Sequence, residues 1–171
     1  LQADVRRFAD GLGGDARALV LDAVLAAEEA TAALFAALPI ESGARSRLRM
    51  TAPAAKQRDR TCAALEELGR VLERLPDEQK ADAPDAALRG AERQGLVGRV
   101  VEARGELHFV LERALDDVRF VVVVEPERRG TLATAAPVDV AAALAGTLFA
   151  DSIPVVMTSA TLAVAGNADA F

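Results

Sequence analysis

Apolar residues recur every three or four positions through the first two thirds of the chain, which predicts a succession of amphipathic helices. The first helix fits residues 2–10, and a longer one fits residues 15–38, where Pro39 supplies a stop signal. The longer helix should bury one apolar row, with a second row beside it: Val20, Val24, Ala27, Leu34 and Leu38, then Leu21, Leu25 and Phe35. Three glycines, Gly11, Gly13 and Gly14, separate the two helices.

Two further long helices are expected after an irregular connection over residues 40–53, where no hydrophobic period is visible. One fits residues 54–75, and its inward leucines are Leu65, Leu68, Leu72 and Leu75. The other begins near Pro84, which suits a first helical turn, and runs to about residue 115. Its glycines each cost roughly 1 kcal/mol relative to alanine if exposed, and they are Gly90, Gly95, Gly98 and Gly105. Unless close helix packing explains them, we expect a break near Gly95.

The hydrophobic period changes near residue 119. The β-branched run over residues 119–125 predicts a buried strand, and residues 131–135 can return antiparallel after a turn to form a hairpin. A short helix should follow from Val138 or Val140 to Phe149, and a last apolar strand spans residues 155–158. This last strand must pair with the hairpin or with strands that this chain does not contain. We therefore predict an α+β fold, in which long antiparallel helices precede a hairpin, a short helix and a terminal strand.

Composition narrows the class of protein. The chain has 171 residues and a formal net charge of -6, with one cysteine, one histidine, and neither tryptophan nor tyrosine. A lone cysteine forms no internal disulfide, and Cys62 with His108 gives no zinc-ligand spacing. No apolar run approaches the length of a membrane span, and no signal sequence opens the chain, so we expect a cytoplasmic location. Because the chain begins with Leu1, it fits an excised or processed piece as well as a trimmed terminus.

Nucleotide-binding motifs are absent from the sequence. A phosphate-binding loop needs a lysine directly after a glycine, and neither Lys56 nor Lys80 has one. The acidic stretch over residues 77–80 has no preceding apolar strand to aim it at a metal ion, so we interpret it as a solvated turn. His108 and Cys62 are interpreted as helix residues without a catalytic role. The chain alone should therefore hydrolyse no nucleotide.

Small hydroxyl residues follow the last predicted strand. Thr158, Ser159 and Thr161 lie with Ala160 at its carboxyl end, which is where ligand-facing loops emerge in α/β sheets. Hydroxyls at this position can link a nucleotide site to another region by hydrogen bonds, or they can simply cap the strand end.

The longer sequence context resembles a known family. Residues 118–171 are similar to the DinG/XPD-like branch of superfamily two DNA helicases, in which a strand and hairpin lead to a Pro-[ILV]-Asp-Val element, here residues 137–140. A short helix ending in Leu-Phe follows, here residues 148–149, and then an apolar strand leads into the Thr-Ser-Ala-Thr-Leu of helicase motif three, here residues 158–162. A phenylalanine, here Phe171, comes a few residues later.

The resemblance implies a role for each part of the chain. In this family motif three couples ATP hydrolysis to movement on DNA, which would assign that role to Thr158, Ser159, Ala160 and Thr161. Family members also insert a helical arch domain before motif three, and residues 1–117 occupy that place, while residues 118–171 would belong to the first motor domain. The complete enzyme would use ATP and magnesium, act on single-stranded or forked DNA in DNA repair, and move 5′ to 3′. Other parts of the family are absent from this sequence: the phosphate-binding loop, the DEAH-type motif that binds magnesium, the iron–sulfur cysteines and the second motor domain.

One basic stretch bears on DNA independently of the resemblance. Residues 45–60 contain six cations and a single acidic residue, Asp59. The cations are Arg45, Arg47, Arg49, Lys56, Arg58 and Arg60. They could hold phosphates beside a DNA path, or they could form a solvated loop and helix start. The rival function is a non-enzymatic helical interaction module, whose terminal strand pairs with a partner or with a second copy in a homodimer.

Overall fold

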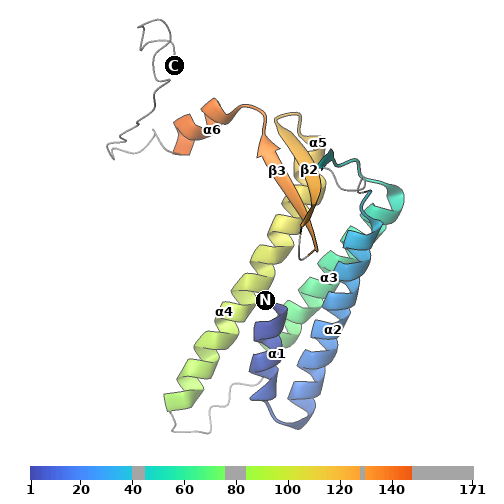
Figure 1. Cartoon of the computed structure of the whole chain (residues 1–171). Coiled ribbons are helices and arrows are strands. Elements are labelled where there is room, and N and C mark those ends of the chain that lie inside the picture. Colours follow the sequence, from blue (N-terminus) through green and yellow to red (C-terminus); the bar gives the residue numbers. More distant parts are fainter. Residues whose placement is uncertain (40–44, 76–83, 128–129, 148–171) are drawn as a thin grey trace, which may run out of the picture. The chain divides into compact units, whose positions relative to one another are not determined.

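The computed structural model describes residues 1–39, 45–75, 84–127 and 130–147 (Figure 1). In the described part of the chain, long helices precede a small antiparallel sheet, which confirms the α+β class. The helices are α1 (Gln2–Asp10), α2 (Gly14–Ala37), α3 (Ala52–Arg74), α4 (Pro84–His108), the π-helical segment η1 (Phe109–Arg113), α5 (Ala114–Asp116) and α6 (Val140–Thr147). The strands are β1 (Ser46–Arg47), β2 (Phe120–Glu127) and β3 (Gly130–Pro137). The predicted strand over residues 155–158 lies outside the described residues.

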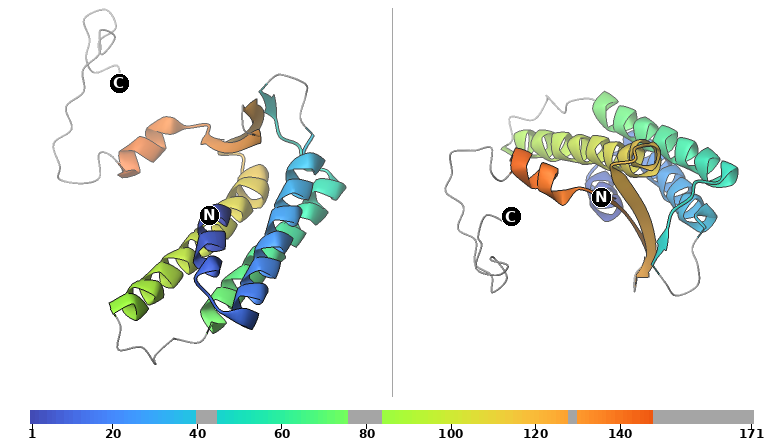
Figure 2. Two further views of the ribbon diagram at one scale, coloured as in Figure 1. Left: turned by 60° about the horizontal axis from the view of Figure 1, so that its bottom comes forward. Right: turned by 90° about the horizontal axis from the view of Figure 1, so that it is seen from above.

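The chain divides into two compact units, Leu1–Ala136 and Pro137–Phe171. In the first unit, α2, α3 and α4 run alternately up and down, and α3 packs against both of the others (Figures 1 and 2). Helix α1 contacts α2 and α4. The sheet belongs to this same unit, and α6 belongs to the second. The predicted domain boundary after residue 117 stays a prediction.

The larger hydrophobic core fills the space between α1, α2, α3 and α4. The predicted inward rows of α2 and α3 are buried, and the central side chains Val24, Leu68 and Leu72 have at most 1% of their surface exposed. Helix α1 contributes Val5, Phe8 and Ala9. In the second apolar row of α2, Leu21 and Phe35 are partly buried against the two cores, whereas Leu25 is 49% exposed. The second row is therefore only partly used in packing.

A single polar side chain, Thr61 of α3, is fully buried among the described residues. Its Oγ1 atom lies 3.0 Å from the carbonyl oxygen of Ala30 in α2 and 2.9 Å from that of Gln57 in its own helix. Both partners are carbonyl acceptors, so the buried hydroxyl has hydrogen-bond partners for its proton. The contact with the Ala30 carbonyl also joins α2 to α3.

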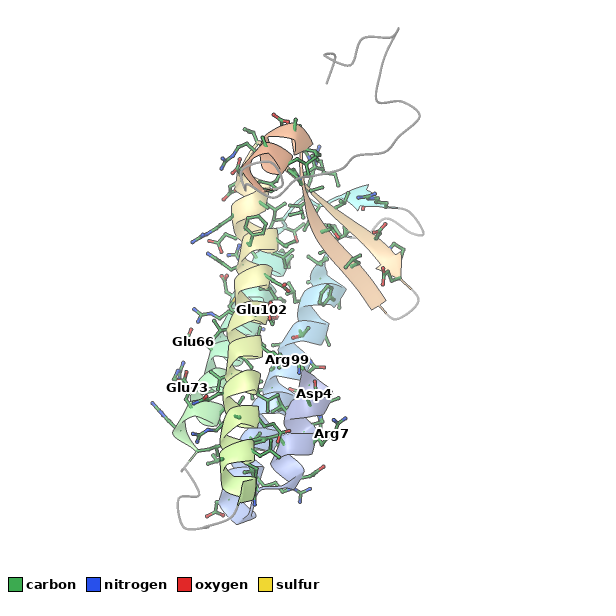
Figure 3. All side chains as sticks on the ribbon, turned by 90° about the vertical axis from the view of Figure 1, so that its left-hand side faces the viewer. Asp4, Arg7, Glu66, Glu73, Arg99 and Glu102 are labelled. Atoms are coloured by element: carbon green, nitrogen blue, oxygen red, sulfur yellow. The ribbon has the colours of Figure 1, made fainter. Side chains whose placement is uncertain are left out.

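Salt bridges also join elements at the bundle surface. Arg99 of α4 reaches Asp4 of α1 at 2.7 Å, and the two side chains lie beside each other in Figure 3. Arg6 of α1 pairs in the same way with Glu28 of α2. These exposed pairs fix the short first helix against its neighbours, although each contributes little free energy on its own.

Helix α4 is unbroken through Gly90, Gly95, Gly98 and Gly105, so the break predicted near Gly95 is wrong. Close packing does not explain these glycines either, because a Cβ atom added at any of them would meet no atom within 4 Å. The helix continues because its other face is anchored in the core through Leu96 and Val100. Tertiary packing thus outweighs the local helix propensity.

The second hydrophobic core lies under the sheet. Its buried members come from α2, α3, the η1–α5 region, β2 and the residue after β1, and they include Leu34, Leu48, Leu111, Val122 and Val124. Strand β1 pairs antiparallel with β2, with Ser46 opposite Val124 and Arg47 opposite Val123, and the order across the sheet is β1–β2–β3. The connection predicted as irregular over residues 40–53 therefore contains a short strand, whose pairing partner lies more than 70 residues further along the chain.

We expect Thr61→Val to lower the free energy of unfolding by about 1 kcal/mol, because the buried α2–α3 hydrogen bond is lost while the volume is kept. Urea denaturation followed by circular dichroism measures this. Thr31→Val is the matched control, because the Thr31 hydroxyl bonds only the Ala27 carbonyl of its own helix, at 2.7 Å. Equal losses in the two variants would show that the link between helices contributes nothing.

The carboxyl group of Asp117, which precedes β2, should titrate at unusually low pH. Hydrogen bonds from the Arg119 side chain and backbone lower the pKa of Asp117 to about 2, from an ordinary value of 3.8. Because the folded-state pKa is depressed, this stabilisation is complete above the ordinary pKa and is lost as the pH falls through about 2. We expect an NMR titration of Arg119→Gln to show the Asp117 midpoint moved upward. An unchanged midpoint would assign the shift to the backbone alone.

Candidate nucleic-acid interface

Three of the predicted DNA-binding arginines lie on one side of an extended segment. Over residues 45–50 exposed and sheltered positions alternate, with Arg45, Arg47 and Arg49 exposed. Leu48 is 2% exposed and belongs to the core under the sheet, against which Met50 also packs. Because side chains of an extended segment alternate between its two faces, the three arginines share the outer face.

This segment is held at both of its ends. The Leu48 amide donates to the carbonyl oxygen of Val122 in β2 at 2.8 Å, which continues the pairing of β1 by one residue. Thr51 then caps α3, since its Oγ1 accepts a hydrogen bond from the Ala54 amide at 3.3 Å. The arginine row therefore sits on a supported backbone that leads directly into the first turn of α3 (Figure 1).

Two further predicted cations lie on the amino-terminal half of α3. Lys56 and Arg60 are both exposed, and their spacing of four residues places them on one face of the helix. The beginning of a helix carries a partial positive charge, so it adds to the potential of these side chains. We call Arg45, Arg47, Arg49, Lys56 and Arg60 the basic strip.

The basic strip has no counter-ions among the described residues: none of its five side chains forms a hydrogen bond or salt bridge there. Elsewhere on the bundle, arginines are commonly paired, as Arg17 is with Asp10, Arg99 with Asp4 and Arg104 with Glu66. Within residues 45–60 these five cations occur with a single acidic residue, Asp59, so the stretch is locally positive on a chain whose net charge is -6. Such a surface attracts polyanions.

The sixth predicted DNA-binding residue, Arg58, is placed differently. Its guanidinium contacts Asp59 at 2.7 Å, the carbonyl oxygen of Leu111 in η1 at 3.3 Å and Glu112 at 3.5 Å, and its side chain is only 16% exposed. The hydrogen bond to Asp59 is the largest cause that raises the pKa of Arg58. Arg58 thus links α3 to η1, and its predicted role in DNA binding stays a prediction.

Arg58 donates a hydrogen bond to a carbonyl group of the π-helical segment η1. A π turn widens the hydrogen-bonding pattern of the helix backbone, and such segments are rare within helices. The Arg58 guanidinium supplies a donor to the Leu111 carbonyl inside this turn. Sequence reasoning missed both features, because a single widened turn leaves no signature in the hydrophobic pattern.

A mixed-charge groove of about 500 Å³ lies between α3 and the α4–η1 helix. The carboxylates lining it have nearby partners: Arg104 contacts Glu66, Arg58 contacts Asp59, and His108 Nδ1 lies 2.8 Å from Glu112. Burial raises the pKa of the Cys62 thiol, which keeps it protonated. The non-catalytic interpretation of His108 and Cys62 stays a prediction.

Two further predictions concern motif three and metal binding. Thr158, Ser159, Ala160 and Thr161 lie outside the described residues, so their role stays a prediction. In the ranges that the structure describes, no three His, Cys, Asp or Glu side chains gather to hold a metal ion, and no helix is long and apolar enough to cross a bilayer.

Comparison of the chain with protein-family models, with curated protein sequences and with solved structures finds no match.

We expect Arg58→Met to lower the free energy of unfolding by about 1–2 kcal/mol, because the Leu111 carbonyl loses a charged hydrogen-bond donor. Thermal unfolding measures the loss. Lys56→Met is the matched control: it removes the same charge from an exposed position two residues earlier on α3 and should change stability by less than about 0.5 kcal/mol. Equal stability of the two variants would contradict the structural role of Arg58.

Proposed function

We propose that the chain is a segment of an ATP-dependent DNA helicase of the DinG/XPD-like kind. In this proposal, residues 1–117 form the helical arch-like domain and residues 118–171 belong to the first motor domain. The order of elements supports it, since a helical bundle is followed by the hairpin β2–β3 and the short helix α6. The observation that carries the DNA contact is the basic strip, which has no counter-ions among the described residues.

Polyanion binding is the role that suits the basic strip best. Five adjacent cations repel one another, and a phosphate backbone relieves this repulsion while releasing its own condensed counter-ions. An acidic chain that concentrates positive charge in one place also orients a DNA strand toward that place and away from the rest of its surface. The strip would hold single-stranded or forked DNA beside the path of the motor.

ATP and magnesium belong to the complete enzyme in this proposal. ATP hydrolysis would drive movement, with a 5′ to 3′ direction carried over from the resemblance. Thr158, Ser159, Ala160 and Thr161 would connect the nucleotide site with the DNA path through their hydroxyl and backbone groups. The remaining motor domains are then partners of this segment, which by itself should hydrolyse no ATP. The proposal places the enzyme in the cytoplasm and in DNA repair.

One observation favours a different function, a non-enzymatic interaction module. Helix α6 contains no charged residue, and Val140 and Leu144 on it are 53% and 42% exposed. A helix that is apolar on all sides is usually buried. It could lie inside a motor domain or against another protein. Single-strand binding separates the two functions: the helicase segment should bind DNA in a salt-sensitive way, whereas the module should not.

Binding of labelled oligo(dT) tests the helicase proposal directly. We expect fluorescence anisotropy at low salt to detect micromolar binding to the wild-type chain. Binding should be lost when Arg45, Arg47 and Arg49 are replaced together by alanine. The matched control replaces Arg7, Arg74 and Arg113, which are exposed and outside the strip, and it should bind as the wild type does.

The control makes the result specific to position, because both triple variants change the net charge equally. A wild-type chain that binds no oligo(dT) at low salt would remove the DNA contact from the proposal. Equal losses in the two triple variants would show that overall charge, and not the basic strip, controls binding. Circular dichroism establishes that each variant is folded.

A further inference from the structure

We propose that a second copy of this chain pairs with the open edge of β3, so that the sheets of two chains join into one. This inference goes beyond the proposed function and does not depend on it. Two observations carry it: β3 is a long edge strand without a charged residue, and an apolar groove lies beside it.

The two edges of the sheet differ. In the order β1–β2–β3, each outer strand has one edge that pairs with no other strand among the described residues (Figure 1). Strand β1 has two residues and exposes Arg47, whereas β3 has eight residues and no charge. Natural sheets usually protect an open edge with a charged side chain or a very short strand, because its unpaired amides and carbonyls can bind another strand. The edge at β1 has both protections, and the edge at β3 has neither.

A groove of about 540 Å³ lies beside β3 and is lined mainly by apolar side chains of this strand, of α2 and of the α4–η1 helix. Phe109 and Leu132, which line it, are each 40% exposed. Among the described residues that line the groove, only Glu106 is charged. A strand added at the edge of β3 would lie roughly 5 Å from it and would cover part of this apolar surface.

Charge complementarity selects β3 itself as the added strand. The incoming strand has to be uncharged along most of its length, because a charge buried against β3 and the groove would lose its hydration without gaining a partner. Among the described strands, only β3 has no charged side chain. Antiparallel pairing of β3 with its own copy is symmetric, since each chain offers the other the same edge. A second copy therefore meets the requirement without any other partner.

The symmetric pair has a register that suits its side chains. Directly opposed residues of two strands place their side chains on the same face of the sheet. On β3, Ala133 and Ala135 pack against the core under the sheet, and the exposed residues Leu132 and Thr134 alternate with them. With Ala133 on the two-fold axis, Leu132 lies opposite Thr134 of the second copy, and Thr131 lies opposite Ala135. Matching faces then meet, and no like charges are opposed.

Charged variants of β3 test this pairing. One variant replaces Leu132 and Thr134, both exposed, by lysine, and a second replaces them by glutamate. Sedimentation velocity of the 171-residue chain from roughly 1 to 100 µM measures self-association. We expect the wild type to dimerise and each variant to associate at least about tenfold more weakly, because like charges then lie opposite each other twice. An equimolar mixture of the two variants should recover the wild-type association, since each lysine then lies opposite a glutamate.

The matched control replaces Leu19 and Leu25 of α2, which are also exposed, by lysine, so the net charge changes as it does in the β3 lysine variant. This control should dimerise as the wild type does, and circular dichroism establishes that every variant is folded before mixing. A wild-type chain that stays monomeric over the whole concentration range overturns the inference. Association that the β3 variants leave unchanged, or that their mixture fails to recover, overturns it too, because the contact then lies on another surface. Binding of oligo(dT) is measured separately, so the proposed function can fail or stand independently of this result.

Discussion

Burial of the apolar stripe of α3 between α2 and α4 is the interaction on which the rest of the first unit depends. Leu65, Leu68 and Leu72 fill the larger core, and Ala54 at the other end of the same helix enters the core under the sheet. Because α3, like α2, contributes to both cores, the bundle and the sheet share these helices as a common support. That support also carries Lys56 and Arg60 on its exposed side, so the basic strip is positioned by hydrophobic packing.

Charged side chains are distributed unevenly around α3, and this difference distinguishes the basic strip from the groove between α3 and α4. In the groove between α3 and α4, opposite charges meet closely, as Arg104 and Glu66 do at 3.3 Å. On the basic strip, no cation forms a salt bridge with a described residue. The first arrangement stabilises a helix interface, whereas the second leaves a positive potential that can attract an anion.

Sequence analysis predicted the features that depend on neighbouring residues and missed those that depend on contacts between residues far apart in the chain. The ends of α1, α2 and α3 followed from hydrophobic spacing and from boundary residues such as Pro39, since both signals lie within a few residues of what they specify. Strand β1 was missed because Ser46 pairs with Val124, a residue that no local pattern connects to it. The continuity of α4 through its glycines was missed for a related reason, since distant packing of Leu96 and Val100 supports it. Among the candidate site residues, exposure of the strip arginines could be expected from their alternation with Leu48. The engagement of Arg58 with Leu111 could not, because it requires the folded bundle and a π turn.

The Thr61 hydroxyl has a mechanical consequence. Hydrophobic contacts between helices change gradually when one helix slides along another, but a hydrogen bond to a single carbonyl is lost within a fraction of an ångström. The contact between Thr61 and Ala30 therefore fixes the axial register of α3 against α2. Sliding of α3 along α2 would therefore have to break this bond before the hydrophobic contacts between the two helices change appreciably.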